Sequence, residues 1–410
     1  MTAETLPPAD PPRPATDHEP EAVTRLRREA LSALEEAAPE ALGRLRADPE
    51  LAADLERVVP ASEFVVRALT ARPDLLGELV DSGDLGRAYD EGEYARRVEQ
   101  ALAEAADDNA LGTALRRLRR REMVRIIWRD LAGRAELDAT TADLSAFAEA
   151  CIDGTLAHLE TWQRAEMGTP MGAYSGTIQR LVVLGMGKLG AGELNVSSDI
   201  DLIFAFPEAG ETAGATRSVD NERYFTRLGQ RLIQALDATT AEGRVFRVDM
   251  RLRPFGEAGA LVASFDALET YYQLHGREWE RYALIKARVV GGDRTAGAAL
   301  MEQLRPFVYR RYLDYGAFES IRDMKALINR EVRRKGLEGN IKLGAGGIRE
   351  VEFIAQAFQL IRGGRDSELR RRDLRGVLRL LASDEVLTDY AARELDAAYV
   401  FLRHLEHRLQ

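Results

Sequence analysis

Two aspartates separated by one residue, Asp199 and Asp201, constrain this chain more than any other feature. They stand at the start of Ile200–Phe206, an apolar and β-branched run that predicts a buried strand. Because side chains alternate along a strand, both carboxylates point to one face while Ile200 and Leu202 enter the core. Two carboxylates this close repel each other, and they are costly near a core unless a divalent cation lies between them. Oxygen ligands favour Mg²⁺, which usually keeps phosphate oxygens in its remaining positions, so the pair indicates chemistry at phosphorus.

A glycine-punctuated loop precedes the aspartate pair. A short apolar run, residues 181–184, is predicted as the strand that leads into it. Gly187, Gly190 and Gly192 let the backbone approach an anion closely, and we expect amide groups and Lys188 to bind phosphate there. A tight turn between a strand and a helix uses the same residues, so the loop alone is weak evidence for binding.

A third acid, Asp249, lies in residues 245–253, where apolar and polar residues alternate strictly and predict a strand. If that strand is adjacent to the one with the aspartate pair, the three carboxylates can share two Mg²⁺ ions and clamp both oxygens of an in-line displacement. The alternation places Arg251 on the same face, roughly 7 Å from Asp249 along the strand. We expect Arg251 and Arg253 to bind phosphate oxygens. The alternative is a structural network in which these acids pair with neighbours such as Arg247.

Helical patterns surround this centre. Residues 21–165 are rich in Ala, Leu, Arg and Glu with few glycines, and a further helix is predicted over 221–236. From residue 265 onward the helical pattern returns, interrupted by a glycine pair at 291–292 and by the loop 342–347. The sequence therefore predicts a mostly helical α+β fold with a small mixed sheet, flanked by amino- and carboxyl-terminal helical regions.

Three helical segments leave alternatives open. Residues 116–121 are the densest basic segment, and we favour a solvated face of an amphipathic helix over an anion-binding role. A helix predicted over 346–362 places Arg349, Glu352, Gln356 and Gln359 on one stripe, which is either an ordinary solvated face or a wall of the active site. A helix is also predicted over 271–290, where Arg281 and Arg288 are either structural or face the substrate.

Charge, cysteine content and hydropathy exclude several classes of protein. Lys and Arg total 57 against 67 Asp and Glu, and the net charge of −10 disfavours general binding to nucleic acid. A single cysteine, Cys151, rules out an intrachain disulfide and fits a reducing compartment. Because no apolar run could span a bilayer and the first residues are acidic and proline-rich, we expect a cytoplasmic protein without a membrane partner. Residues 1–20 are predicted as a disordered tail, and the helical pattern of 399–410 has no stop signal, as expected of a piece of a longer protein.

Four sequence blocks carry a resemblance to known proteins. They read GMGKLG and ELNVSSDIDL (within 185–202), VDMRLRPFG (248–256), WERYA (279–283) and KLGAGGIREVEF (342–353). The first block and the later aspartate resemble the polymerase-β-type nucleotidyltransferase superfamily, which usually has serine where this chain has Lys188. All four, in this order, are similar to the glutamine synthetase adenylyltransferase/adenylyl-removing enzyme family. The NVSS before the aspartate pair and the RY after Trp-Glu resemble the amino-terminal half of that family, which removes AMP.

The resemblance implies a domain order and an activity. After the tail 1–20 and a helical region 21–165, it implies a polymerase-β-like catalytic domain at 166–305 and a helical domain at 306–410 similar to that of PII-uridylyltransferase. The implied reaction is metal-dependent phosphorolysis, in which inorganic phosphate attacks the AMP–tyrosine bond of adenylylated glutamine synthetase. Its products are ADP and the unmodified, active enzyme of nitrogen regulation.

The resemblance also implies a site and a set of partners. Asp199, Asp201 and Asp249 would hold Mg²⁺, as two ions, with Arg251 as a further catalytic residue. Residues expected to bind substrate or phosphate are Gly187, Lys188, Ser198, Arg253, Arg349 and Glu352. Expected partners are adenylylated glutamine synthetase, the PII signalling protein and the carboxyl-terminal adenylyltransferase half of the full-length protein. The alternatives are an ATP-dependent adenylyltransferase and a regulatory fragment without catalysis.

Overall fold

The computed structural model describes residues 21–310, 315–337 and 339–409, and the predicted tail 1–20 lies outside them. The described residues are mostly helical with two small sheets, so the α+β fold class is confirmed. They belong to two compact units, Met1–Gly86 and Arg87–Gln410. Among these residues no helix is both long and apolar enough to cross a membrane.

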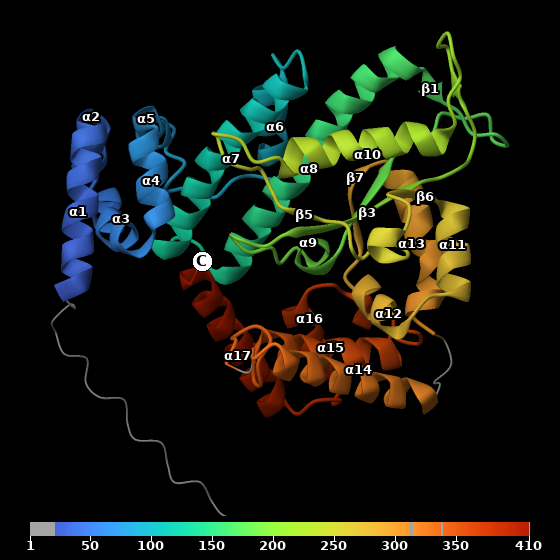
Figure 1. Ribbon diagram of the computed structural model, residues 1–410. Helices are drawn as coiled ribbons and strands as arrows, with labels where there is room; N and C mark the ends of the chain where they lie inside the picture. The colour runs from blue at the N-terminus through green and yellow to red at the C-terminus, as the bar shows by residue number, and fades with distance from the viewer. Residues whose placement is uncertain (1–20, 311–314, 338, 410) are drawn as a thin grey trace, which may run out of the picture. The chain divides into compact units, whose positions relative to one another are not determined.

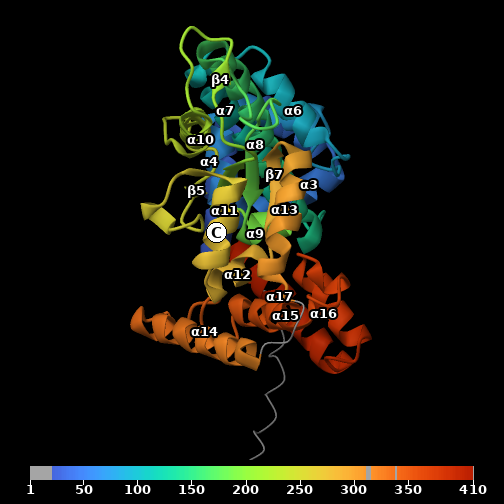
Figure 2. The same ribbon diagram turned by 90° about the vertical axis from the view of Figure 1, so that its right-hand side faces the viewer.

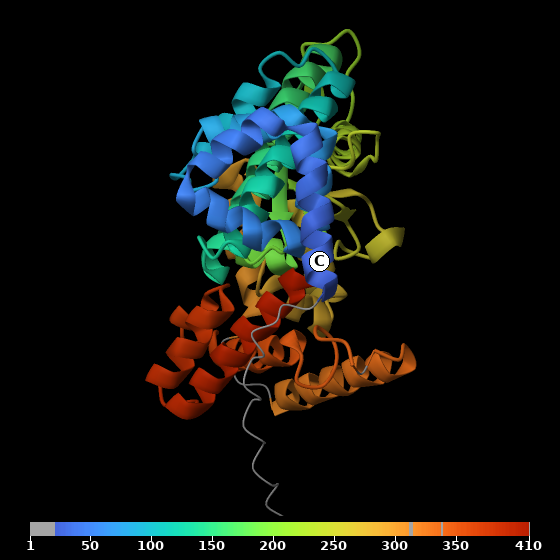
Figure 3. The same ribbon diagram turned by 90° about the vertical axis from the view of Figure 1, so that its left-hand side faces the viewer.

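The first unit consists of short helices, shown in blue in Figures 1 and 3. Prolines occupy the first turn of three of them, where the missing N–H has no intrahelical partner to lose. The helix between two of these begins after Ser62, whose hydroxyl accepts the N–H of Val65 as an N-cap. The elements are α1 (Glu21–Ala37), α2 (Pro39–Ala47), α3 (Pro49–Val58), η1 (Val59–Ala61), α4 (Glu63–Ala71) and α5 (Pro73–Asp81).

The second unit holds the remaining helices. They are α6 (Glu93–Leu102), α7 (Asp108–Leu131), α8 (Leu137–Met167), α9 (Gly187–Ala191), α10 (Asn221–Asp237), η2 (Gly256–Ala258), α11 (Phe265–Leu274), α12 (Glu278–Leu284), α13 (Arg294–Val308), α14 (Tyr315–Arg334), α15 (Ile348–Arg362), η3 (Glu368–Arg370), α16 (Leu374–Ser383) and α17 (Asp389–Arg408). The helix predicted over 221–236 is confirmed as α10.

A five-stranded mixed sheet lies among these helices (Figures 1 and 2). Its strands are β2 (Val182–Gly185), β3 (Ile200–Phe206), β5 (Val248–Asp249), β6 (Val262–Ser264) and β7 (Arg288–Gly292), while β1 (Thr169–Pro170) and β4 (Thr212–Ala213) form a separate pair. The central strand β3 is antiparallel to β2, and it is parallel to β5 at its start and to β6 at its end. The strands predicted at 181–184 and at Ile200–Phe206 are confirmed.

Helices cover both faces of the sheet, so β3 is buried almost along its whole length. Ile203 and Ala205 belong to a core that includes residues of α11 and α13. On the other face, a Cβ added to Gly229 of α10 would lie 2.8 Å from the ring of Phe204. Helix α8 packs against β7 on the sheet, and its Cys151 is fully buried, which raises the pKa of the thiol far above its usual range.

The strand predicted over residues 245–253 is wrong except at its two central residues. Before β5, the N–H of Phe246 donates to Leu236 O (2.9 Å) instead of to a neighbouring strand. After β5 the chain turns, and the N–H of Arg251 donates to Asp249 Oδ1 (2.8 Å). These local acceptors take the N–H groups that a longer ladder would need, so the alternating pattern does not produce an extended segment.

The single helix predicted over 271–290 is also wrong. This region contains the end of α11, all of α12 and the start of β7, which pairs with β2. The glycine pair 291–292 ends β7 and does not interrupt a helix. Gly292 has φ of +79°, and a Cβ there would lie 1.9 Å from Leu181 O, so only glycine permits this close approach.

In helix α7 the basic segment 116–121 is mostly buried or half-buried, so the predicted solvated face is wrong. Arg116 is 6% exposed, and it donates from Nε to Gly243 O (3.0 Å) and from Nη2 to Ala238 O (2.8 Å). Of the six residues in the segment, only Arg117 is exposed. A guanidinium carries several donors, and here they satisfy carbonyls of the turn that follows α10.

Helices α15, α16 and α17 pack around a separate core, and Figure 2 shows them gathered together. On α15, the polar stripe that was expected to be either solvated or part of a site is partly buried. Gln356 and Gln359 are buried, and Gln359 Nε2 donates to Leu369 O (2.7 Å) and to Arg371 O (2.6 Å). A simple solvated face is therefore excluded for these two residues.

Candidate active site

The aspartate pair meets the third acid across two parallel strands. In the register of β3 and β5, Asp201 lies opposite Asp249, and Asp199 precedes Asp201 by two residues. The glycine loop closes over the pair, because a Cβ on Gly187 would lie 2.8 Å from Asp201 Oδ2. Gly187 has φ of +52°, so both its conformation and its space require glycine.

The three acids share one electrostatic neighbourhood. Burial, together with the negative charges of Asp249 and Asp199, raises the pKa of Asp201 to about 6. The positive charges of Lys342 and Arg251 act in the opposite direction. Asp201 is therefore the acid that is most costly to ionise without a nearby cation.

Each of the outer acids is paired with an arginine. Arg251 donates from Nε to Asp249 Oδ2 (2.9 Å) and from Nη2 to the same oxygen (2.5 Å), and these bonds, partly opposed by burial, lower the pKa of Asp249. Arg247 forms an ion pair with Asp199. The expected separation of roughly 7 Å between Asp249 and Arg251 is therefore wrong, since the turn after β5 brings the guanidinium directly onto the carboxylate.

The chemistry of this acid cluster fits magnesium, although two of its three carboxylates form ion pairs with arginines. Carboxylate oxygens are the ligands that Mg²⁺ takes, and the raised pKa of Asp201 is typical of a carboxylate that faces other acids. Within the described ranges, no group of three or more His, Cys, Asp or Glu side chains is gathered closely enough to hold a metal ion. Two of the three acids are instead paired with arginines, Asp199 with Arg247 and Asp249 with Arg251.

Two of the expected phosphate ligands are committed to other partners. The Lys188 ammonium donates to both carboxylate oxygens of Glu406, at 2.9 and 3.0 Å. Arg253 donates from Nη1 to Met250 O (2.8 Å), and its other nitrogens reach carbonyls of the loop that follows. In this arrangement Arg253 holds its own loop together and does not extend toward the acids.

The remaining expected site residues are spread over two places. Ser198 Oγ accepts the N–H of Asn195 (3.3 Å) in the turn just before the aspartate pair. Arg349 is exposed on the first turn of α15. Glu352, one turn further on, contacts Lys286 Nζ (2.7 Å) inside a buried charged cluster.

Sequence reasoning missed two lysines near these residues. Lys286 is 6% exposed and lies between Glu193 (3.2 Å) and Glu352. Lys342 is exposed, and its charge lowers the pKa of Asp201 and, with burial and Arg403, that of Lys188. Usable signals were present: Lys286 directly follows the apolar residues 283–285, and Lys342 opens the fourth sequence block.

The chain matches two protein families. Residues 52–303 match the family described as glutamate-ammonia ligase adenylyltransferase. Residues 322–410 match the family described as GlnD PII-uridylyltransferase.

Similar curated proteins carry one description, bifunctional glutamine synthetase adenylyltransferase/adenylyl-removing enzyme. That of Nitrosococcus oceani is 61% identical over 350 residues, which are 85% of this chain and 36% of the relative. That of Pseudomonas aeruginosa is 57% identical over 93% of this chain and 39% of the relative. That of Thioalkalivibrio sulfidiphilus is 55% identical over 98% of this chain and 41% of the relative. The chain thus spans about two fifths of the length of these relatives.

Proposed function

Because the chain belongs to the glutamate-ammonia ligase adenylyltransferase family, we propose that it acts in the control of glutamine synthetase by adenylylation. More specifically, it removes AMP from an adenylylated tyrosine of glutamine synthetase by phosphorolysis, and so activates that enzyme. The match of residues 322–410 to PII-uridylyltransferase supports the PII signalling protein as a partner. An adenylyltransferase half would accompany this chain in a protein as long as its relatives.

The parallel pairing of Asp201 with Asp249 is the observation that carries the proposal. It brings acids from two distant parts of the sequence to one edge of the sheet, with Asp199 beside them. Three carboxylates at one point are costly unless positive charge arrives with the substrate or with a metal. Such an arrangement is suited to the transfer of a phosphoryl or nucleotidyl group.

In the proposed reaction, an oxygen of inorganic phosphate attacks the phosphorus of the AMP–tyrosine diester. The bond from phosphorus to the tyrosine oxygen breaks, and the tyrosine takes up a proton, which gives ADP and unmodified glutamine synthetase. Magnesium held by Asp199, Asp201 and Asp249 would supply positive charge to the phosphate oxygens. Arg251 and Lys342, whose charges both act on Asp201, would offset the repulsion between two anionic reactants. Arg251 would then release the Asp249 carboxylate and bind phosphate in its place.

The direction of transfer rests on sequence details. The segment NVSS before the aspartate pair and the Arg281–Tyr282 pair resemble the adenylyl-removing half of the family. The relatives are described as carrying both activities, so ATP-dependent adenylylation is the second candidate, and a regulatory fragment without catalysis is the third.

One experiment separates the three candidates. The chain is incubated with adenylylated glutamine synthetase, Mg²⁺ and inorganic phosphate, and ADP is measured by chromatography; a parallel reaction contains unmodified glutamine synthetase and ATP. Phosphate-dependent ADP supports the proposal. AMP transfer from ATP without ADP release from the adenylylated enzyme supports the second candidate. The absence of both activities supports the third.

A further inference from the structure

Helix α17 presents two buried charged residues to the glycine loop. Arg403 and Glu406 lie one turn apart and are 1% and 6% exposed, and we call them the α17 clamp. Arg403 Nε and Glu406 Oε2 are 3.4 Å apart. Both residues extend from the last helix toward the segment 188–195, about two hundred residues earlier in the chain.

Glu406 holds the first end of that segment. Its two carboxylate oxygens accept hydrogen bonds from Lys188 Nζ, and the Lys188 and Glu406 side chains are 11% and 8% exposed. Burial, aided by the charges of Arg403 and Lys342 and opposed by that of Glu406, lowers the pKa of Lys188 to about 8. The ammonium is therefore stabilised in its buried position chiefly by this one carboxylate.

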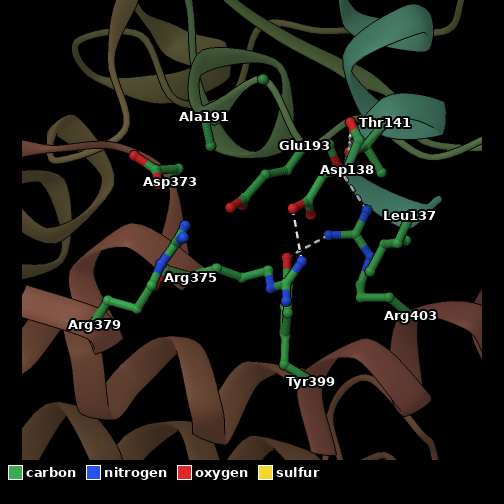
Figure 4. A pocket seen from close by; sticks show the side chains of 11 residues that line it. Leu137, Asp138, Thr141, Ala191, Glu193, Asp373, Arg375, Arg379, Tyr399 and Arg403 are labelled. Atoms are coloured by element: carbon green, nitrogen blue, oxygen red, sulfur yellow. Dashed lines mark hydrogen bonds and ion pairs between the residues drawn. The ribbon is translucent and has the colours of Figure 1, made fainter. Parts of the chain in front are cut away.

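Arg403 holds the other end of the segment. Its Nη2 donates to Glu193 O (2.7 Å) and also contacts Asn195 Oδ1, while Nη1 donates to the hydroxyl of Tyr399 (2.5 Å). Figure 4 shows Arg403, Tyr399 and Glu193 at one pocket, which is lined by residues of α8 and the glycine loop and by residues of the carboxyl-terminal helices. The Glu193 carboxylate accepts the N–H of Leu374 (2.8 Å), so α16 is fixed to the same point.

The segment held by the α17 clamp leads at both ends to the acid cluster. On one side, Gly187 precedes Lys188 and abuts Asp201 Oδ2. On the other side, the N–H of Asn195 donates to Ser198 Oγ (3.3 Å), and Asp199 follows directly. A shift of α9 would therefore move the glycine that touches one acid and the turn that carries another.

We propose that Arg403 and Glu406 are positioning residues for the catalytic aspartates: they hold the segment 188–195 so that Gly187 and Asp199 keep their places around Asp201. The carboxyl-terminal helices are then a structural part of the active site. Lys188 serves as the anchor of the glycine loop and not as the ligand of free phosphate. The kinetic consequence rests on the proposed function, whereas the effect on the loop does not.

Glu406→Gln tests the proposal directly. We expect hydrogen exchange of the amides in residues 187–198 to accelerate, and kcat for AMP removal to fall about tenfold or more, because small misplacements of reacting groups are expensive. The KM for adenylylated glutamine synthetase should stay unchanged, since the clamp residues are buried and present almost no surface to another protein. A role in overall stability alone would lower the Tm without lowering kcat selectively at an unchanged KM.

Because Glu406→Gln leaves a buried ammonium without its carboxylate, that variant can fail to fold. The double variant Lys188→Met/Glu406→Gln removes both charges, and it should fold while showing the same fast exchange and low kcat. The variant Lys188→Arg/Glu406→Asp keeps the pair at nearly constant total length, and it should recover most of the lost kcat.

Asp396→Asn on the same helix is the matched control. Asp396 pairs with Arg375 (2.7 Å) on α16 and not with the glycine loop, so kcat and exchange at 187–198 should remain as in the wild type. Unchanged exchange in the Lys188→Met/Glu406→Gln variant would overturn the proposal, and so would fast exchange with an unaltered kcat. If the wild-type chain releases no ADP, the proposed function fails, and the exchange measurement alone decides whether the clamp positions the loop.

Discussion

At the residue scale, the acids of the site differ in what holds them. Asp199 and Asp249 each contact an arginine, whereas Asp201 faces the other two acids and is largely buried. Loss of charge at these positions therefore has different structural consequences, because neutralisation of Asp199 or Asp249 also breaks an ion pair with an arginine. Substitutions at Asp249 release Arg251 as well as removing a carboxylate.

Asp201→Asn should abolish AMP removal while the fold persists. The amide is close in shape to the carboxylate, but it lacks the negative charge that would bind a metal ion at the reacting phosphate. We expect an unchanged or slightly raised Tm together with loss of ADP formation, and the same loss for Asp199→Asn. Turnover close to the wild-type value at low Mg²⁺ would contradict the assignment.

Arg251→Ala should raise the KM for phosphate and keep the dependence on metal. The side chain is 69% exposed and forms an ion pair with Asp249, so its loss should leave the Tm nearly unchanged. Steady-state rates at varied phosphate concentration measure the effect.

Arg253→Ala provides the comparison, because that side chain binds carbonyls of its own loop. It should lower the Tm instead of altering phosphate saturation alone. If phosphate saturation is the same in Arg251→Ala and in the wild type, Arg251 is only a structural partner of Asp249.

At the scale of helices and strands, burial of charged side chains explains much that pattern alone does not show. The arginines of α7 bind carbonyls of the turn after α10, and Arg288 of β7 pairs with Glu149 of α8 (2.8 Å). Such contacts join elements that are far apart in the sequence, and they depend on which elements become neighbours. A basic run on a helix therefore has no single meaning before the fold is known.

Arg116→Met should destabilise the second unit. It removes the donors from Ala238 O, whereas Gly243 O keeps the N–H of Thr240 (3.0 Å), and a carbonyl that loses its partner costs about 1–3 kcal/mol. Urea denaturation should give a lower free energy of unfolding with an unchanged m-value. Arg117→Met, one position along the same helix and exposed, should leave the free energy of unfolding unchanged. Equal stability of the two variants would show that the Arg116 contacts contribute nothing.

Strand β3, which begins at the aspartate pair, and its neighbour β2 could be predicted because they are short, largely apolar runs bounded by glycine or by acids. The pattern at 245–253 misled because its N–H groups find local acceptors, and alternation does not reveal that. The meeting of Asp201 with Asp249 could be expected only on the condition that their strands pair, which depends on tertiary structure. The Lys188–Glu406 contact joins residues 218 positions apart, and nothing near either residue in the sequence indicates it.

At the scale of the whole molecule, the two family matches follow each other along the chain, at 52–303 and at 322–410. The acids proposed to be catalytic lie in the range of the first match, and the α17 clamp lies in that of the second. The domain boundaries expected at 165 and 305 stay a prediction, while the described residues separate into compact units at Gly86. Contacts such as Lys188–Glu406 and Lys286–Glu352 join the sheet-bearing part to the last helices.

The chain should show no useful transfer of AMP from ATP to unmodified glutamine synthetase. Its sequence resembles the half of the family that removes AMP, and it spans about two fifths of its relatives' length. Initial rates with radiolabelled ATP measure this directly. Robust incorporation of label, abolished by Asp201→Asn, would reverse the assigned direction.

The burial of Cys151 has a practical consequence. It is the chain's single cysteine, it is fully enclosed in α8, and its thiol is held in the unreactive protonated form. A maleimide dye should therefore leave the native protein unmodified, and a cysteine introduced at an exposed position would be a unique attachment point for a fluorophore. Under native conditions, slow reaction of Cys151 itself with a small thiol reagent would report how often the interior around α8 opens to solvent.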